Sequence, residues 1–418
     1  MSNITGAASA GWGNRIMDRF SHMRSLYGKA VTKAPALRER FEKAGLTPAG
    51  LVDEGALNRL PVLTKERLMQ LQATNPPFAG FLSCDIAEIA HIYVSPGPIC
   101  EPGLANDKTG HGMDRMFREA GIGPGDIALN SWAYHLVPAG LLFDQGLRAV
   151  GATVIPSGTG NTALQAQLLC DLKPTVFLGS TAYFATLVEQ LASDGKTLPA
   201  DWTLKHAFLG GEFGDWSAKR RAIENQYGLK TWSCYATADF GLIGFERDGE
   251  DGYQIHEDRY VQICDPVSGA PLPPGDSGEI VVTTLARGWP MIRFGTGDVA
   301  HAKTLAADGG VQQISALEGR VGAAVKVREI FVYPGHLEAL VRQSDGITAA
   351  RAEITRQDGR DYITLELVKD GNTGVEPQEE KLRVLFQSLT RLKADRLHWL
   401  ESEADFTIGG LLVDSMPT

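Results

Sequence analysis

The segment Gly146–Phe184, "GLRAVGATVIPSGTGNTALQAQLLCDLKPTVFLGSTAYF", decides the fold of this 418-residue chain. Two short apolar runs, at residues 152–158 and 174–180, flank a run with helical periodicity at residues 162–173. Apolar strands that alternate with helices are typical of a parallel sheet covered by helices on both faces. The segment therefore predicts a doubly wound α/β core.

The same alternation continues on either side of this segment. Further apolar runs occupy residues 126–132, 206–212 and 230–236. Residues 1 to about 75 predict amphipathic helices instead, and Thr64 has the hydroxyl expected of a helix N-cap. We therefore expect a helical N-terminal part followed by the α/β core.

The pattern changes after about Tyr253. Residues 260–284 predict two strands joined by a Pro/Gly-rich loop, and hence a small β subdomain within the large domain. Farther on, the Asp358-Gly359 pair predicts a hairpin turn. An apolar helical stripe then follows at Leu382, Leu385, Phe386, Leu389 and Leu392. We expect a large domain at residues 1–318 and a small α+β C-terminal domain at residues 322–418.

Composition and charge narrow the function classes. The chain has 40 basic and 50 acidic residues and no Lys/Arg-rich tract, so we expect neither nucleic acid nor an anionic membrane as a partner. It has no run of 18 apolar residues and no apolar segment typical of a secretory signal, which favours a cytoplasmic protein. Its five cysteines show no C-x-x-C spacing, so we expect no structural zinc.

Several long stretches resemble a known family in the order in which they occur. They include "LPVLTKERL" (60–68), "GGEFGDWSAKRRAIENQYGLKTWSCY" (210–235), "MIRFGTGDVA" (291–300) and "LEGRVGAAVKVREIFVYPGHLEALV" (317–341). From about residue 60 to 345 the chain is similar to the phenylacetate-coenzyme A ligases of the adenylate-forming superfamily. That family joins a carboxylate to ATP and then passes the acyl group to coenzyme A. The resemblance implies AMP or ATP and coenzyme A as cofactors, and a small carboxylate or acyl-CoA as the partner. The use of Mg²⁺ and the formation of a homodimer stay open.

The phosphate loop is the first place where the chain departs from the family. The family's S-S-G-T-T-G-K-P binds the β- and γ-phosphates through backbone N–H groups, hydroxyls and a lysine. Here the loop reads "VSPGPICEPG" (94–103), in which two prolines remove N–H donors and Glu101 replaces the lysine. Such a charge reversal changes an interaction worth about 4 kcal/mol at a surface dielectric. We expect that the loop has lost its phosphate-binding role and remains as a turn.

The resemblance implies a nucleotide site in the large domain. Tyr235 would lie near the adenine, and Asp298 would hold the ribose hydroxyls. Arg320 belongs to "GRVG" (319–322), which stands where the family has its hinge motif G-R-x-D. Arg320 would contact ribose or phosphate. Asp239 replaces the family's Mg²⁺-binding glutamate, so it is the candidate metal ligand and catalytic carboxylate, although an ordinary strand end is the alternative. Ala238 replaces the threonine that contacts the α-phosphate.

The acyl pocket is implied at two segments. After a predicted buried strand come the cofactor-binding candidates Gly211 and Glu212 and the substrate-binding candidates Gly210 and Phe213. Ligands in such sheets bind beyond the carboxyl ends of the strands, but a tight turn is the alternative. In "SWAYHLVPAG" (131–140), Tyr134 is a candidate substrate contact and His135 a candidate base. The alternative for His135 is a purely local role at a helix start.

The C-terminal tail departs from the family as well. The family has a catalytic lysine there, but no Lys or Arg follows Arg396, and Gly409, Gly410 and Leu411 stand where its G-K falls. We therefore expect an enzyme of this family acting on a small, aromatic carboxylic acid or its activated derivative, with ATP-dependent adenylation weakened or lost. Acyl transfer, condensation and hydrolysis are the reactions left open. The alternatives are a working ATP-dependent aryl- or acyl-CoA ligase and a non-catalytic binding subunit.

Overall fold

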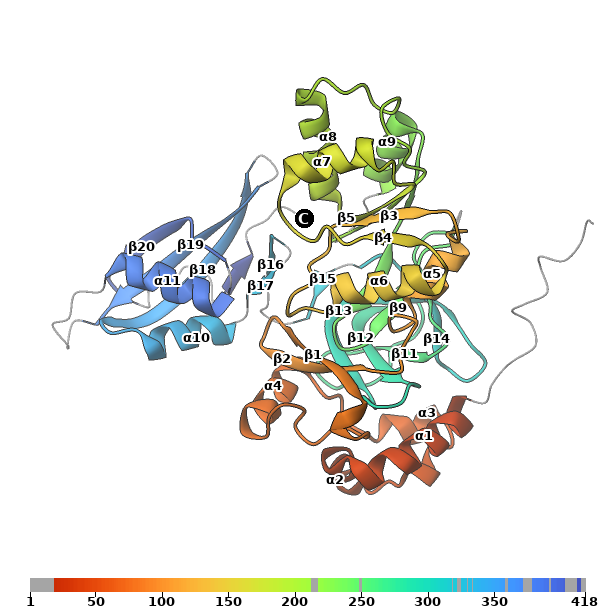
Figure 1. Ribbon diagram of the computed structural model, residues 1–418. Coiled ribbons are helices and arrows are strands. Elements are labelled where there is room, and N and C mark those ends of the chain that lie inside the picture. Colours follow the sequence, from red (N-terminus) through yellow and green to blue (C-terminus); the bar gives the residue numbers. More distant parts are fainter. Residues whose placement is uncertain are drawn as a thin grey trace, which may run out of the picture. The chain divides into compact units, whose positions relative to one another are not determined.

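The computed structural model forms two compact units (Figure 1). The first comprises residues 1–95 and 99–319, and the second comprises residues 320–418 together with residues 96–98. The structure describes residues 19–211, 217–247, 250–317, 319–321, 325–328, 330–332, 334–357, 360–370, 378–390, 392–402 and 412–414. Within these ranges, no helix combines the length and the hydropathy that crossing a bilayer requires.

A parallel sheet with the strand order β4-β3-β5-β6-β7 forms the centre of the first unit. Its strands are β3 (Ile127–Asn130), β4 (Thr153–Ile155), β5 (Val176–Ser180), β6 (His206–Gly210) and β7 (Lys230–Trp232). Along β5, Val176 and Leu178 face one side of the sheet and Phe177 faces the other, as the two-residue repeat of a strand requires.

Helices cover both faces of this sheet (Figure 1). On the side of Val176 lie α5 (Met113–Glu119) and α6 (Ala139–Ala149). On the side of Phe177 lie α7 (Thr162–Asp171), α8 (Thr181–Ser193) and α9 (Ser217–Tyr227). The doubly wound α/β core predicted from the sequence is confirmed.

A mainly antiparallel sheet follows, in the order β11-β12-β13-β14-β10-β9-β8. Its strands are β8 (Cys234–Thr237), β9 (Gly241–Phe245), β10 (Tyr253–Ile255), β11 (Arg259–Cys264), β12 (Ser277–Thr284), β13 (Phe294–Leu305) and β14 (Val311–Ile314), and β15 (Gly319–Arg320) comes after them. The predicted pairing of β11 with β12 is confirmed, but the sheet is larger than the small subdomain expected and already begins at Cys234. The run 230–236 was expected to form one strand, but it divides at Ser233. There the Glu246 carboxylate accepts the N–H of Ser233 at 2.8 Å.

Within the described residues, the N-terminal part is helical, as the sequence predicted. Its elements are α1 (Arg19–Lys33), α2 (Pro35–Lys43), η1 (Pro48–Gly50), α3 (Glu54–Asn58), α4 (Lys65–Thr74) and η2 (Ile86–Glu88). Thr64 caps α4, because its Oγ1 accepts the N–H of Arg67 at 3.2 Å. The loop 94–103 proves to be a hairpin of β1 (Ile89–Ser95) and β2 (Ile99–Leu104), although the sequence predicted no regular element after the loop.

Arg293 joins the N-terminal helices to the antiparallel sheet. Its side chain is only 2% exposed, and its Nη1 donates to the carbonyl oxygens of Asn58 and Leu60 at 3.0 and 2.9 Å. Its Nη2 donates to the carbonyl of Gly269, and its own carbonyl accepts the N–H of Leu63 at 2.8 Å. These bonds fix the segment just before α4, and so they fix where α4 begins.

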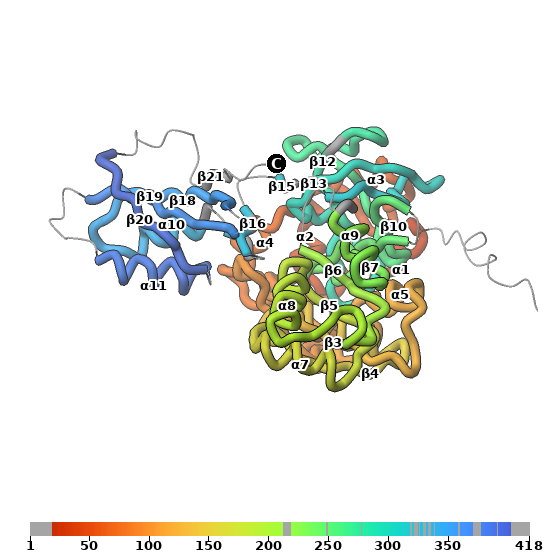
Figure 2. The backbone as a smooth tube through the Cα atoms, turned by 90° about the horizontal axis from the view of Figure 1, so that it is seen from above, coloured from red at the N-terminus to blue at the C-terminus, as the bar shows by residue number. Residues whose placement is uncertain are grey.

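The second unit, taken by itself, is a four-stranded sheet in the order β20-β19-β18-β21, against which two helices pack (Figure 2). Its elements are β16 (Val325–Val327), β17 (Ile330–Val332), α10 (Pro334–Gln343), β18 (Ile347–Gln357), β19 (Arg360–Lys369), α11 (Glu379–Thr390), β20 (Arg396–Leu400) and β21 (Leu412–Asp414). The predicted hairpin is present, with Gln357 paired to Arg360, although its Asp358-Gly359 turn lies outside the described residues. Leu382 and Phe386 of α11 are buried, which confirms the predicted stripe and the α+β class.

We predict that Arg293→Met destabilises the first unit by about 2–4 kcal/mol, because it leaves buried carbonyl groups without donors. The free energy of unfolding in urea, followed by tryptophan fluorescence, measures this loss. Arg221→Met, which removes an exposed arginine of α9, is the matched control and should change stability by no more than about 0.5 kcal/mol. Equal stability of the two variants would contradict the anchoring role of Arg293.

Candidate active site

The loop hairpin closes on itself through two polar side chains. β1 and β2 remain paired up to Ser95 and Ile99, so only three residues form the tip. The Ser95 hydroxyl donates to Oε1 of Glu101, and both side chains are buried, Glu101 with only 2% of its surface exposed. Glu101, at the position of the family's lysine, is therefore bonded within the hairpin instead of reaching out to solvent.

A second buried carboxylate lies next to this pair. Asp239 follows β8, its side chain is 1% exposed, and Nζ of Lys65 lies 3.0 Å from its Oδ2. Among the described residues, neither Oδ1 of Asp239 nor Oε2 of Glu101 finds a hydrogen-bond partner. Burial, together with the negative charge of Asp239, raises the pKa of Glu101 well above its ordinary value, and Ser95 and Lys65 oppose this only in part.

The environment of Glu101 adds to the sequence-based expectation, in which its carboxylate reverses the charge of the loop. Burial and the neighbouring Asp239 raise the pKa of Glu101, because a second buried anion beside Asp239 is costly. The shift favours the protonated form, in which the loop would have lost a cation without gaining an anion.

Helix α4 positions Lys65, the one member of this cluster that the sequence analysis missed. Two turns after Lys65 on the same helix face, the Gln72 side chain donates to the Cys100 carbonyl and accepts the Cys100 N–H, both at 2.8 Å. The helix thus holds β2 at one end and Asp239 at the other. A cation in the first turn opposes the helix dipole, and this was the available signal that Lys65 needs a tertiary partner.

Two residues that the resemblance assigns to the nucleotide meet in the structure. The Tyr235 hydroxyl, from β8, donates to Oδ2 of Asp298, from β13, at 2.9 Å. Both side chains are buried, and the N–H of Asp298 also donates to Oγ1 of Thr296 at 3.2 Å. The pairing fixes the Asp298 carboxylate in orientation, but its contact with ribose stays a prediction.

The residues implied for the acyl pocket lie at the carboxyl end of the parallel sheet. Gly210 ends β6, and Gly211 has a positive φ of 101°, which a side chain would strain. Glu212 and Phe213 lie outside the described residues. The position of Gly210 and Gly211 matches the edge at which such sheets bind ligands, and their contacts with a substrate stay a prediction.

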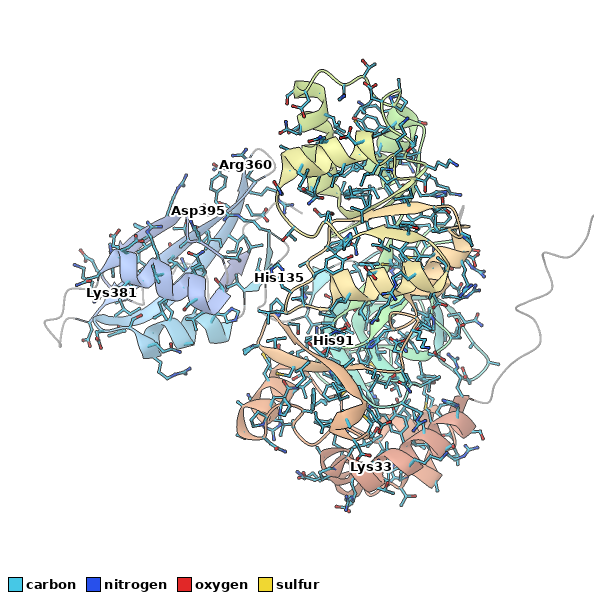
Figure 3. The ribbon with its side chains drawn as sticks, in the orientation of Figure 1. Lys33, His91, His135, Arg360, Lys381 and Asp395 are labelled. Atoms are coloured by element: carbon cyan, nitrogen blue, oxygen red, sulfur yellow. The ribbon has the colours of Figure 1, made fainter. Side chains whose placement is uncertain are left out.

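Tyr134 and His135 follow β3 and differ in environment. The Tyr134 hydroxyl donates to Asp144 at 3.2 Å and accepts from Asn130 at 2.8 Å, so its polar group is used within the protein. His135 is exposed (Figure 3), and no side chain in the described part of the chain bonds to its ring. The adjacent carbonyl of Leu136 accepts the N–H of Val94 at 2.8 Å, which places this loop against the hairpin. The catalytic role of His135 stays a prediction.

The basic residues in and after the hinge motif belong to the second unit. Arg320 opens the second unit, and its ribose contact stays a prediction. Arg328 donates to the Asp395 carboxylate and to the carbonyl of Asp361, each at 2.6 Å. The side chain of Lys326 lies outside the described residues.

The residues around Asp239 fit Mg²⁺ poorly. Among the described residues, no group of three His, Cys, Asp or Glu side chains is arranged to hold a metal. Mg²⁺ needs only one or two carboxylates when phosphates and waters complete its shell. However, Lys65 already pairs with Asp239, and the pKa of Glu101 is raised, so a divalent cation would have to displace a buried ion pair.

Comparisons with known proteins support the resemblance. No protein-family model matches the chain. It is 27% identical over 351 residues to the phenylacetate-coenzyme A ligase of Thermus thermophilus, covering 81% of this chain and 77% of that one. It is 29% identical over 324 residues to the phenylacetate-coenzyme A ligase of Pseudomonas putida, covering 75% and 72%. A 2-hydroxyisobutyryl-CoA ligase, solved in complex with 2-HIB-AMP and CoA, matches with a TM-score of 0.84 at 24% identity, covering 96% of this chain and 91% of that one.

The fold is therefore that of the adenylate-forming CoA ligases. In sequence, the chain is similar to four phenylacetate-coenzyme A ligases, as the motifs predicted. These relatives are acyl-CoA ligases, and they match most of the chain.

We predict that Glu101→Gln gains stability over the wild type as the pH rises. The folded-state pKa of Glu101 is raised, so its favourable contribution is complete below its ordinary pKa of 4.5 and is lost as the pH rises through the folded value. Glutamine cannot ionise in either state. The difference in free energy of unfolding should therefore grow by up to about 1.4 kcal/mol per pH unit above that pKa.

Urea unfolding of both proteins from about pH 5 to about pH 8 measures this difference. Glu42→Gln, which changes an exposed glutamate of α2, is the control and should show no such trend. A constant difference between Glu101→Gln and the wild type would mean that Glu101 is ionised in the folded protein.

Proposed function

We propose that this protein acts on a small aromatic acyl group that is already activated, as a coenzyme A thioester or an adenylate, and that its own ATP-dependent adenylation is weakened or lost. The acyl group moves to a nucleophile, in transfer, condensation or hydrolysis. Under this proposal, the acyl-CoA ligase fold catalyses reactions of an activated acyl group and does not need to activate the acid with ATP.

The observation that carries the proposal is the closure of the hairpin between Ser95 and Glu101. The hydroxyl that would face a phosphate is donated to a buried carboxyl, and the two flanking prolines offer no N–H. The cation at hand, Lys65, is held by Asp239. A triphosphate would have to break both contacts before it found a donor.

The parts suited to an acyl-nucleotide or acyl-CoA remain in place. The Tyr235–Asp298 pair offers an oriented carboxylate for ribose hydroxyls, and Gly210 and Gly211 open the strand edge where an acyl group would lie. His135 is the candidate base, because its imidazole is exposed and histidine is the side chain that most often serves as a general base. In thioester hydrolysis it would accept a proton from water as oxygen bonds the carbonyl carbon, and the departing thiolate would then take that proton.

We predict turnover of benzoyl- or phenylacetyl-CoA without ATP, measured as release of free thiol. We also predict no ATP–pyrophosphate exchange above background with benzoate, phenylacetate or anthranilate. His135→Asn should slow thiol release by about 10²- to 10⁴-fold, the usual contribution of a general base. His91→Asn, which alters an exposed histidine of β1 (Figure 3), is the matched control and should keep full activity.

If neither thiol release nor pyrophosphate exchange is detected, the result favours a non-catalytic binding subunit. Exchange with any acid of the panel would contradict the loss of adenylation.

The second candidate function is a working ATP-dependent acyl-CoA ligase. It is favoured by one observation, the Lys65 ammonium 3.0 Å from Asp239, which puts a cation where the loop lysine is missing. On binding ATP, Lys65 would have to move from the carboxylate to a phosphate oxygen. A preorganised donor of this kind contributes roughly 10² to 10³ in rate.

Lys65→Met separates the two candidates. Under our proposal, pyrophosphate exchange is at background in both the wild type and this variant. Under the ligase alternative, exchange is robust in the wild type and falls by about 10²-fold or more in Lys65→Met. Lys43→Met removes an exposed lysine of α2 and should leave any exchange unchanged. The melting temperature of each variant shows whether the variant is still folded.

A further inference from the structure

A cavity of about 710 Å³ lies inside the first unit, on the side of Asp239 that faces the N-terminal helix. Three segments far apart in the sequence form its walls: α1, residues 104–112 after β2, and the loop 284–289. Asp239 and Phe240 line it as well. Its volume is in the range of sites that enclose a small organic ligand, roughly 300–1,000 Å³.

One face of α1 supplies the first wall. His22, Leu26, Lys29 and Lys33 line the cavity. Their spacing of three or four residues places them on the same side of the helix. The opposite side, with Met23 and Tyr27, packs into the core. The wall is therefore a polar helix face backed by buried side chains.

Buried hydrogen bonds hold this wall to the loop 284–289. The Tyr27 hydroxyl lies 2.8 Å from the carbonyl oxygen of Thr284, and Nε2 of His22 lies 2.9 Å from that of Leu285. The Trp289 ring packs edge-on against Phe78, at 5.8 Å between ring centroids. These contacts hold the walls of the cavity in place. Binding of a ligand would therefore not require these walls to become ordered.

Arg259 fixes the part of the cavity next to Asp239. Its side chain is buried, and Nη2 donates to the carbonyl oxygens of Phe240 at 2.5 Å and of His111 at 3.4 Å. It thus joins the turn that carries Asp239 to the wall 104–112. A ligand in the cavity would lie against that turn.

Most charged groups around the cavity are already engaged. Asp107 accepts the N–H of His111 at 2.8 Å, and Glu88 accepts the N–H of Asp85 at 2.9 Å. Lys33 forms an ion pair with Asp85 at 3.2 Å. These groups stabilise their own loops and are poor candidates for binding a ligand.

Among the described charged side chains that line the cavity, two cations and one anion are not engaged in this way. Lys29 and Arg287 are exposed, line the cavity and have no ion pair or side-chain hydrogen bond within the described residues. Asp258 is the remaining uncommitted acid. Leu26, Leu285 and Trp289 add apolar surface to the lining of the cavity.

We propose that this cavity binds a small organic anion through Lys29 and Arg287. The anionic group is a carboxylate or a phosphate, because an ammonium and a guanidinium both recognise either one. The body of the ligand packs on the apolar wall. This site does not depend on whether the loop hairpin admits ATP.

Calorimetric titration with three probes, sodium phenylacetate, AMP and inorganic pyrophosphate, tests the proposal. We expect saturable binding of at least one probe, weakened at least tenfold in Lys29→Ala/Arg287→Ala. Both residues are exposed and unpaired, so the thermal melting of this variant should match the wild type. Which probe responds tells carboxylate from phosphate recognition.

Two controls make the test specific. Lys196→Ala/Arg221→Ala removes the same charges from exposed positions elsewhere on the first unit, and should leave binding unchanged. Asp298→Ala should also leave the cavity's binding unchanged, whereas it should weaken a probe held at the Tyr235–Asp298 pair. The proposal is overturned if no probe binds saturably, if both charge-removing variants weaken binding equally, or if binding responds to Asp298→Ala alone.

Discussion

The ion pair between Lys65 and Asp239 is the interaction on which the candidate site depends. An almost fully buried carboxylate is tolerated only when a partner offsets its charge, and Lys65 is that partner. Its position results from a chain of contacts. Arg293 fixes the segment before α4, Thr64 caps the helix, and Gln72 holds it to β2. Removing any of these would disturb the site from a distance.

The same ion pair explains why an acid can replace the loop's lysine. Lys65 pairs with Asp239, and a second buried negative charge beside that pair is unfavourable, which raises the pKa of Glu101. The Glu101 carboxyl accepts the Ser95 hydroxyl and closes the hairpin. In the family that this chain resembles, the loop is open to phosphate. Here its polar groups satisfy one another, which is why we propose chemistry on an acyl group that is already activated.

Much of the fold could be predicted from the sequence because it depends on local periodicity. The apolar run around Phe177 predicted a buried parallel strand, and the stripe on α11 predicted a packed helix. The division of the run 230–236 could not be predicted, since it depends on Glu246, which lies just after β9 and whose carboxylate accepts the N–H of Ser233.

The candidate site was harder to predict, because its contacts join distant residues. The motifs identified Tyr235 and Asp298, but not their hydrogen bond across 63 residues. Lys65 was missed because nothing local links it to Asp239. The raised pKa of Glu101 could not be predicted, because it depends on burial and on Asp239, which a sequence does not display.

Calorimetric titration of ATP into the wild type and into Glu101→Lys tests the central claim most directly. We expect no saturable binding of ATP to the wild type up to about 1 mM, that is, a binding free energy weaker than about −4 kcal/mol. Glu101→Lys should bind ATP measurably, because it breaks the bond to Ser95 and restores a cation to the loop. Wild-type binding in the micromolar range, unchanged or weakened by Glu101→Lys, would show that the hairpin holds a triphosphate as it stands and would contradict the account.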